Sequence, residues 1–208
     1  DFVTRVYCCP ETSQMPAIVR ETKPNVFIGV PRVWEKMYAG VTAAIAADPV
    51  KEQQFNDGIA AALPIMEKMT AGTATDEEIA TWNFLDEVGF KAIRGMIGLD
   101  QVEIGISGAA PIPAEILGWF RAIGVPLSEG YGMSETTAVL SWSAAAKPGY
   151  VGRPANGVEM KIAEDGEILA RGGNMFEGYL GLPGKTAESI DGEGWVHTGD
   201  IGIIDDDG

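Results

Sequence analysis

The alternation of short apolar runs with helical patterns in the first two thirds of the chain constrains its fold most strongly. Residues 25–30 and 102–106 are apolar runs of strand length, and a helical pattern over residues 33–47 follows the first of them. Residues 75–78, Thr-Asp-Glu-Glu, have the form of a capping box and predict a long amphipathic helix that reaches about residue 97. Strand, helix and strand in this order predict an α/β fold with a doubly wound, mostly parallel sheet.

The texture of the sequence changes after about residue 137, where short strands and turns replace the long helical patterns. Before that point, proline at the start and glycine past the end favour a helix over residues 113–122, and a short apolar strand at 125–127 follows it. Beyond it, the pair Asp165-Gly166 predicts a hairpin. We therefore expect an α/β subdomain over residues 1–137 and a β-rich subdomain over residues 138–208. The strands expected in the second are 138–143, 158–162 and 167–170.

Residues 128–137, Ser-Glu-Gly-Tyr-Gly-Met-Ser-Glu-Thr-Thr, combine glycines with groups that suit a nucleotide. The glycines follow a predicted strand, where the backbone can approach a ligand closely without a Cβ in the way. The ring of Tyr131 can cover a base, and Ser134 and Glu135 supply oxygen groups of the kind that contact phosphate and Mg²⁺. A tight turn with a packed tyrosine is the alternative interpretation of the same residues.

A second segment, Gly-Trp-Val-His-Thr-Gly-Asp at residues 194–200, precedes an apolar run at 201–204 that is expected to be a strand. A carboxylate such as Asp200 at the entrance of a strand can accept both hydroxyls of a ribose. A turn or cap residue is the alternative interpretation of Asp200.

Five segments, in this order along the chain, together resemble the adenylate-forming superfamily of acyl-CoA synthetases, luciferases and peptide-synthetase adenylation domains. They are residues 105–112, 128–137, 151–154, 166–172 and 194–200. Within the superfamily, Val-Pro-Arg-Val-Trp-Glu-Lys at 30–36 resembles the long-chain fatty acyl-CoA synthetases most closely. The resemblance runs from about residue 23 to the end of the chain.

This resemblance implies an enzyme that uses ATP with Mg²⁺ to convert a long-chain fatty acid to an acyl-adenylate, and then transfers the acyl group to coenzyme A. It implies that Tyr131 stacks on adenine, Asp200 holds the ribose hydroxyls and Ser134 contacts phosphate, with a hydroxyl retained where the family usually has Thr. Ser134 and Glu135 are the implied catalytic residues, and Glu135 the implied Mg²⁺ ligand. The other implied roles are Glu129 and Gly130 lining the base and acyl pocket, Gly108 and Ala109 forming the floor under the base, and Trp34 gating the acyl tunnel. Packing in a core is the alternative interpretation of Trp34.

The same resemblance implies that these residues are an internal part of a large domain. A phosphate loop with its lysine is expected before residue 1, and the acidic turn at 205–208 is expected just before the hinge to a separate small domain with a second lysine. We therefore expect the 208 residues alone to have little or no activity. Two other functions remain open: adenylation of another carboxylic acid, as in aryl-CoA ligases or carrier-protein loading domains, and non-catalytic nucleotide binding.

Composition bounds the partners and the compartment. The net charge of −15, from 30 acidic and 15 basic residues, disfavours a nucleic-acid partner because phosphate-dense polymers would be repelled. The sequence has no apolar run of 18 residues, its start lacks the layout of a secretory signal, and adjacent Cys8 and Cys9 favour reduced thiols. A cytoplasmic protein is expected, with peripheral membrane contact if its substrate is a fatty acid. The single histidine excludes a multi-histidine metal site and lies inside the predicted ribose motif, where it does not suit a serine triad.

The segment Gly-Leu-Pro-Gly-Lys-Thr at 181–186 has the ending of a phosphate-binding P-loop. The full pattern requires glycine at position 179, which is Tyr179 here, and Pro183 removes an amide that the loop would use. We therefore expect a surface loop without a phosphate site.

Overall fold

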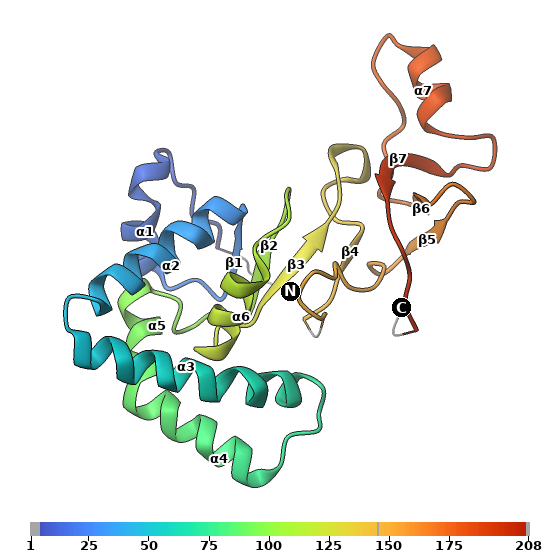
Figure 1. The fold of residues 1–208 in the computed structure, drawn as a ribbon. Helices are drawn as coiled ribbons and strands as arrows, with labels where there is room; N and C mark the ends of the chain where they lie inside the picture. The colour runs from blue at the N-terminus through green and yellow to red at the C-terminus, as the bar shows by residue number, and fades with distance from the viewer. Residues whose placement is uncertain (1–4, 145, 207–208) are drawn as a thin grey trace. The chain divides into compact units, whose positions relative to one another are not determined.

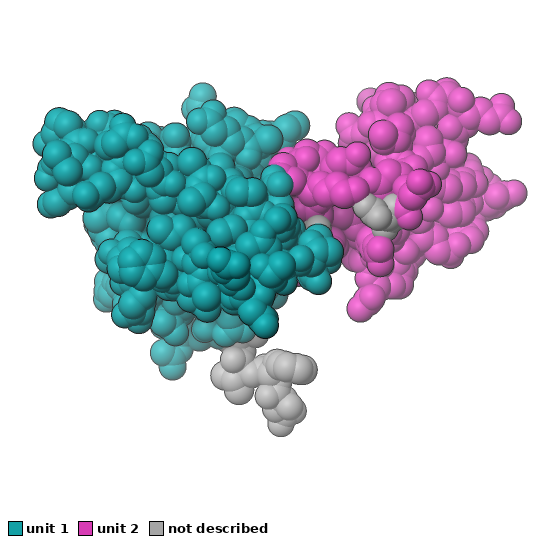
Figure 2. Space-filling view, turned by 60° about the horizontal axis from the view of Figure 1, so that its bottom comes forward, with its two compact units in different colours: residues 1–127 teal, residues 128–208 magenta. Residues whose placement is uncertain are grey.

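The computed structural model describes residues 5–144 and 146–206, which form two compact units that divide after Leu127 (Figure 2). Residues 1–4 and 207–208 lie outside the described residues. The expectation for the start of the chain and part of the acidic turn expected at 205–208 fall on them. The predicted α/β class is confirmed, because a parallel strand pair with helices is followed by an antiparallel, β-rich part (Figure 1). The predicted subdomain division at residue 137 stays a prediction.

The first unit is built on two parallel strands, β1 (Val26–Gly29) and β2 (Ile104–Ser107), paired from Val26 with Ile104 to Gly29 with Ser107. Short 3₁₀ and π segments, η1 (Thr12–Gln14) and η2 (Asp86–Phe90), adjoin the helices. The α-helices are α1 (Met15–Thr22), α2 (Pro31–Ile45), α3 (Pro49–Thr70), α4 (Asp76–Leu85), α5 (Lys91–Ile97) and α6 (Ala114–Ala122).

The core of this unit is organised around aromatic rings. The fully buried ring of Trp34 packs edge-on against Phe27 and Phe120, with ring centroids 5.1 Å apart in both pairs. Phe120 in turn packs edge-on against Trp119 at 5.0 Å. Burying a large apolar side chain contributes about 1.5–3 kcal/mol, so the contact between Trp34 and Phe120 helps to hold α2 against α6.

The helix predicted from residue 76 to about 97 is interrupted. Its capping box at Thr75 is confirmed, but α4 ends at Leu85, and the five-residue π segment η2 precedes α5. The wider turn changes which side chains face the core, so Phe90 is buried and Arg94 pairs with Asp86 while donating to the Ile123 carbonyl at 2.6 Å. No local sequence pattern marks this change.

The second unit contains two antiparallel arrangements. Strand β3 (Leu127–Tyr131) pairs with the short β4 (Ser141–Trp142). A separate sheet has the order β5 (Val158–Ile162), β6 (Glu167–Gly172) and β7 (Val196–Ile201), and the hairpin predicted at Asp165-Gly166 joins β5 to β6. A 3₁₀ turn, η3 (Ser134–Thr136), and helix α7 (Pro183–Ser189) complete it.

Several expectations for the second unit are wrong, and two of them concern residues 138–143 and 181–186. The strand expected over residues 138–143 shrinks to the two residues of β4, because Thr137 and Ala138 have φ of 53° and 79°, which no strand accommodates. The segment 181–186, expected as a surface loop, runs into α7, whose first residue is Pro183. Within the described ranges, none of the helices is long and apolar enough to cross a bilayer.

Candidate nucleotide site

The first predicted motif is partly strand. The sequence predicts a strand at 125–127 that ends before the glycines, whereas β3 runs from Leu127 to Tyr131 and Gly130 pairs with Trp142 across to β4. The strand therefore carries Glu129 and Tyr131 on one face, because side chains alternate along a strand. The buried carboxylate of Glu129 accepts a hydrogen bond from the Gly149 amide at 2.8 Å, so it also fixes the turn around residue 149. The predicted roles of Glu129 and Gly130 in lining a pocket stay predictions.

The chain turns sharply after β3, and this turn requires Gly132. A Cβ at this position would overlap the carbonyl oxygen of Ala138, so the glycine serves the close approach of the chain to itself. The turn is closed by the buried Thr136, whose hydroxyl accepts from the Met133 amide at 3.1 Å. Thr137 and Ala138 follow with positive φ, a conformation that costs non-glycine residues energy and that clusters at functional sites.

Tyr131 and Asp200 connect the two predicted motifs. The Tyr131 hydroxyl donates a hydrogen bond of 2.6 Å to Asp200 Oδ2, although 69 residues separate them along the chain. Burial of the phenol, followed by its hydrogen bond to Asp200, raises the pKa of Tyr131 to about 12. An exposed carboxylate thus lies beside a half-buried ring. The predicted roles of Tyr131 towards adenine and of Asp200 towards the ribose stay predictions.

The segment around Asp200 is held from the neighbouring strand. The sequence predicts that the motif precedes a strand at 201–204, but β7 contains the motif itself and ends at Ile201. Glu167 on β6 accepts the Gly199 amide at 2.8 Å, and its other oxygen lies 2.7 Å from His197 Nδ1. The Thr198 hydroxyl donates to the Ile168 carbonyl at 2.8 Å. These bonds fix the backbone on both sides of Gly199, whose φ is 75°.

Ser134 and Glu135 lie on η3, directly after the turn. Ser134 is exposed, and the half-buried carboxylate of Glu135 accepts a hydrogen bond from the Tyr179 hydroxyl at 2.7 Å, which raises the pKa of Tyr179. Residues 5–144 and 146–206 contain no group of three or more His, Cys, Asp or Glu side chains arranged to hold a metal ion. One carboxylate beside an exposed hydroxyl fits a magnesium ion that takes its other ligands from phosphates and water.

The remaining predicted residues belong to the first unit. Gly108 and Ala109 directly follow β2, and Ala109 has a φ of 70°, so the backbone is strained there. Trp34 donates from Nε1 to the Gly29 carbonyl at 3.2 Å and lies in the core, which agrees with the packing interpretation. The floor role of Gly108 and Ala109 and the gate role of Trp34 stay predictions.

Three residues near the predicted site were missed by the sequence reasoning. Glu167 and Tyr179 contact the motifs directly, and Asn174 donates to the carbonyls of Thr136 and Val139 at 2.9 and 3.2 Å. Glu167 lies in the segment 166–172 that carries part of the resemblance, although no role was predicted for it. Asn174 is an amide side chain directly after Gly172 and Gly173, and asparagine in glycine-rich turns often bonds to backbone.

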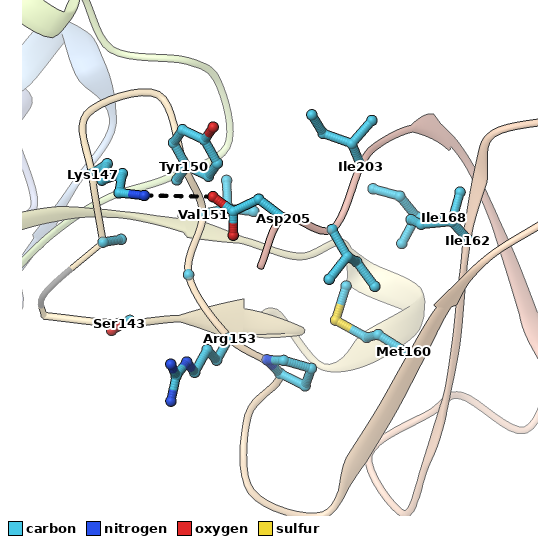
Figure 3. A pocket seen from close by; sticks show the side chains of 14 residues that line it. Ser143, Lys147, Tyr150, Val151, Arg153, Met160, Ile162, Ile168, Ile203 and Asp205 are labelled. Atoms are coloured by element: carbon cyan, nitrogen blue, oxygen red, sulfur yellow. Dashed lines mark ion pairs between the residues drawn. The ribbon is translucent and has the colours of Figure 1, made fainter. Parts of the chain in front are cut away.

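A hollow of about 610 Å³ lies elsewhere in the second unit (Figure 3). Aliphatic side chains such as Met160, Ile168 and Ile203 line much of it, and an ion pair of 3.7 Å joins Lys147 to Asp205. Tyr131, Glu135 and Asp200 are not among its lining residues, so it is distinct from the predicted nucleotide site.

Comparison with known proteins decides the family. The family model for the AMP-binding enzyme matches residues 4–180, which is most of the chain. The chain belongs to the AMP-binding enzyme family.

Relatives within the AMP-binding family carry names that agree on the chemistry. A Mycobacterium tuberculosis protein named fatty-acid–CoA ligase fadD11 is 39% identical over 212 aligned residues, covering 100% of this chain and 37% of the relative. A long-chain-fatty-acid–CoA ligase from Drosophila melanogaster is 36% identical over 196 residues, covering 91% of this chain and 29% of the relative. The chain thus spans about a third of the length of the curated relatives it matches.

Solved structures of the family show the same fold with other acids. A malonyl-CoA ligase, solved with methylmalonyl-CoA and AMP, matches 95% of this chain and 35% of its own at a TM-score of 0.58 and 25% identity. A double mutant of o-succinylbenzoate CoA synthetase from Bacillus subtilis, bound to a product analogue, matches 62% of this chain and 28% of its own at a TM-score of 0.50 and 27% identity.

Proposed function

We propose that the protein containing these residues activates a long-chain fatty acid with ATP, releases pyrophosphate, and transfers the acyl group from the acyl-adenylate to coenzyme A. The observation that carries this proposal is the hydrogen bond of 2.6 Å between Tyr131 and Asp200, which brings together the two segments that the sequence predicts to bind adenosine. The fatty-acid assignment is supported by the names of the relatives.

Each residue has a physical task in this proposal. Tyr131 stacks on adenine, and Asp200 accepts the ribose hydroxyls, so that the adenosine moiety is fixed before the acid arrives. Ser134 donates to a phosphate oxygen, and Glu135 holds the magnesium ion that accompanies ATP. When bound, that ion neutralises phosphate charge, which favours attack of the carboxylate at the α-phosphate. Contact with a membrane surface remains a proposal that follows from a fatty-acid substrate, and a cytoplasmic location remains a proposal that follows from the sequence composition.

A second candidate is adenylation of a different carboxylic acid. It is favoured by the structural likeness to ligases of malonate and o-succinylbenzoate, which act on short or aromatic acids. Both candidates use the same nucleotide chemistry, so only the acid separates them.

The experiment measures acid-dependent ATP–pyrophosphate exchange by the protein expressed from its complete gene, with saturated acids of graded chain length beside benzoate and malonate. We expect the highest kcat/KM for the longer fatty acids, and loss of exchange in Asp200→Ala with every acid. A clear preference for benzoate or malonate would contradict the fatty-acid assignment. Nucleotide binding without exchange on any acid would instead favour a non-catalytic nucleotide-binding protein.

A further inference from the structure

The loop at residues 174–179, which no motif covers, contacts Glu135 twice. The Phe176 amide donates to the Glu135 carbonyl at 2.7 Å, and the Tyr179 hydroxyl donates to Glu135 Oε1 at 2.7 Å. The backbone and the carboxylate of Glu135 are therefore both held by this one loop. Glu135 is only partly buried, so without these bonds its side chain would sample several rotamers.

Tyr179 is itself held by helix α7. Its amide donates to the Thr186 hydroxyl at 2.9 Å, and its ring packs edge-on against Phe176 with centroids 4.9 Å apart. Gly178 has a φ of 141°, and a Cβ there would lie 2.6 Å from the Thr186 methyl carbon. The backbone at Gly178 therefore approaches the Thr186 side chain too closely for any other residue. The segment 181–186, which is unsuited to bind phosphate, thus supports the tyrosine that contacts the predicted metal ligand.

We propose that Tyr179 is a positioning residue for Glu135: its hydroxyl holds Oε1 and leaves Oε2 for the magnesium ion that accompanies ATP. This rests on the proposed function, because it takes Glu135 as the magnesium ligand. Groups that hydrogen-bond to a metal-binding carboxylate fix its orientation, and their removal typically lowers metal affinity by about 10–100-fold. The rival interpretation is that the hydroxyl only stabilises the loop.

The experiment measures ATP binding by calorimetry at increasing Mg²⁺ concentration, with the protein expressed from its complete gene. Tyr179→Phe removes only the hydroxyl and keeps the ring that packs on Phe176. We expect the apparent Mg²⁺ affinity of the ATP complex to fall about tenfold or more. Adenosine has no phosphate and does not need Glu135, so its affinity should equal that of the wild type.

Three further variants make the result specific. Tyr150→Phe removes a hydroxyl from an exposed tyrosine outside the predicted site and should change neither affinity. Thr186→Val removes the acceptor of the Tyr179 amide. It should also lower the apparent Mg²⁺ affinity of the ATP complex, but by a smaller factor than Tyr179→Phe does. In a Glu135→Gln background, Tyr179→Phe should have no additional effect, because the two residues act through one interaction.

The outcomes separate the two proposals. Wild-type Mg²⁺ dependence in Tyr179→Phe, or an equal loss of adenosine and ATP affinity, would overturn the positioning role while leaving the proposed function intact. A Glu135→Gln variant with wild-type Mg²⁺ dependence would overturn the assignment of Glu135, and the positioning role with it. If Tyr179→Phe loses its folded circular dichroism spectrum, Thr186→Val takes its place. Wild-type Mg²⁺ dependence in Thr186→Val, or an equal loss of adenosine and ATP affinity, would then overturn the positioning role.

Discussion

Tyr131 is the residue whose chemistry reports most directly on the predicted site. Its pKa is raised from 10.0 to about 12 by burial and by the bond to Asp200, so the folded state holds the phenolic proton more tightly than the unfolded state. The stabilisation is fully present below pH 10.0 and is lost as the pH rises towards about 12.

We predict that Tyr131 ionises with a midpoint near pH 12. This midpoint is read from the difference in tyrosinate absorbance between the wild type and Tyr131→Phe. The measurement is an ultraviolet pH titration of the wild type and the variant, with the difference attributed to Tyr131. Asp200→Asn removes the charged acceptor but keeps the burial, and should move this midpoint down without returning it to 10.0. A midpoint near 10.0 in the wild type would contradict the bond between Tyr131 and Asp200.

At the scale of single residues, the sequence predicted the motif residues of the site but not the residues that hold them. Tyr131 and Asp200 lie in recognisable motifs, and the structure brings their side chains together, while their roles in binding a nucleotide stay predictions. Tyr179 and Glu167 lie 44 and 32 residues from the groups they contact, and the sequence assigned no role to either side chain. A tyrosine in a turn becomes informative only when the fold shows which carboxylate its hydroxyl reaches.

Among the elements, α4 offers a local test because its N-terminus is capped as the sequence predicts. The Thr75 hydroxyl accepts the Glu78 amide at 3.3 Å, and Glu78 Oε2 accepts the Thr75 amide at 2.9 Å. Lys68 on α3 also pairs with Glu78, and these hydrogen bonds lower the pKa of the Glu78 carboxyl. We predict that Thr75→Ala lowers the free energy of unfolding of α4 by about 1 kcal/mol, because one amide of the first turn loses its acceptor.

Hydrogen exchange of the α4 amides measures this effect locally, and a loss of about 1 kcal/mol corresponds to roughly fivefold faster exchange. Thr81→Ala is the matched control, since it is the same substitution on an exposed interior position of the same helix. It should leave exchange unchanged or slow it, because alanine has the higher helix propensity. Equal acceleration in both variants would contradict the capping role of Thr75.

Elements defined by local patterns were predicted well, and elements defined by their partners were not. Strands β5 and β6 follow an apolar pattern interrupted by Asp165-Gly166, and they form the expected hairpin. Strands β3 and β7 contain polar motif residues that look like loops, yet their backbones pair with β4 and β6. Strand propensity depends on such neighbours, which a single sequence does not display.

At the scale of the whole molecule, β1 has an unusual environment. It is the edge of its sheet within the described residues, and the side chains of Val26 and Ile28 are 53% and 65% exposed. Parallel strands are normally covered on both faces, and exposed apolar edges pair with other chains. The net charge of −15 opposes association. Salt near 0.15 M, however, screens the repulsion between exposed charges beyond about 8 Å.

We predict that residues 1–208 expressed alone self-associate at this salt concentration, and that Ile28→Lys reduces the association. Light scattering measures the molar mass against the 22.1 kDa of one chain. Leu180→Lys, at a fully exposed leucine outside the strands, is the matched control and should not reduce the association. A wild-type polypeptide of 22.1 kDa would contradict the prediction.

The tight turn at Gly132 limits what a motif search can diagnose. Because a side chain there would collide with the Ala138 carbonyl, selection for folding alone is enough to retain the glycine. A descendant that had lost its nucleotide chemistry would still carry it. Inactive members of such a lineage are therefore better recognised by changes at Glu135, Tyr179 or Asp200, to which the proposed nucleotide chemistry is assigned.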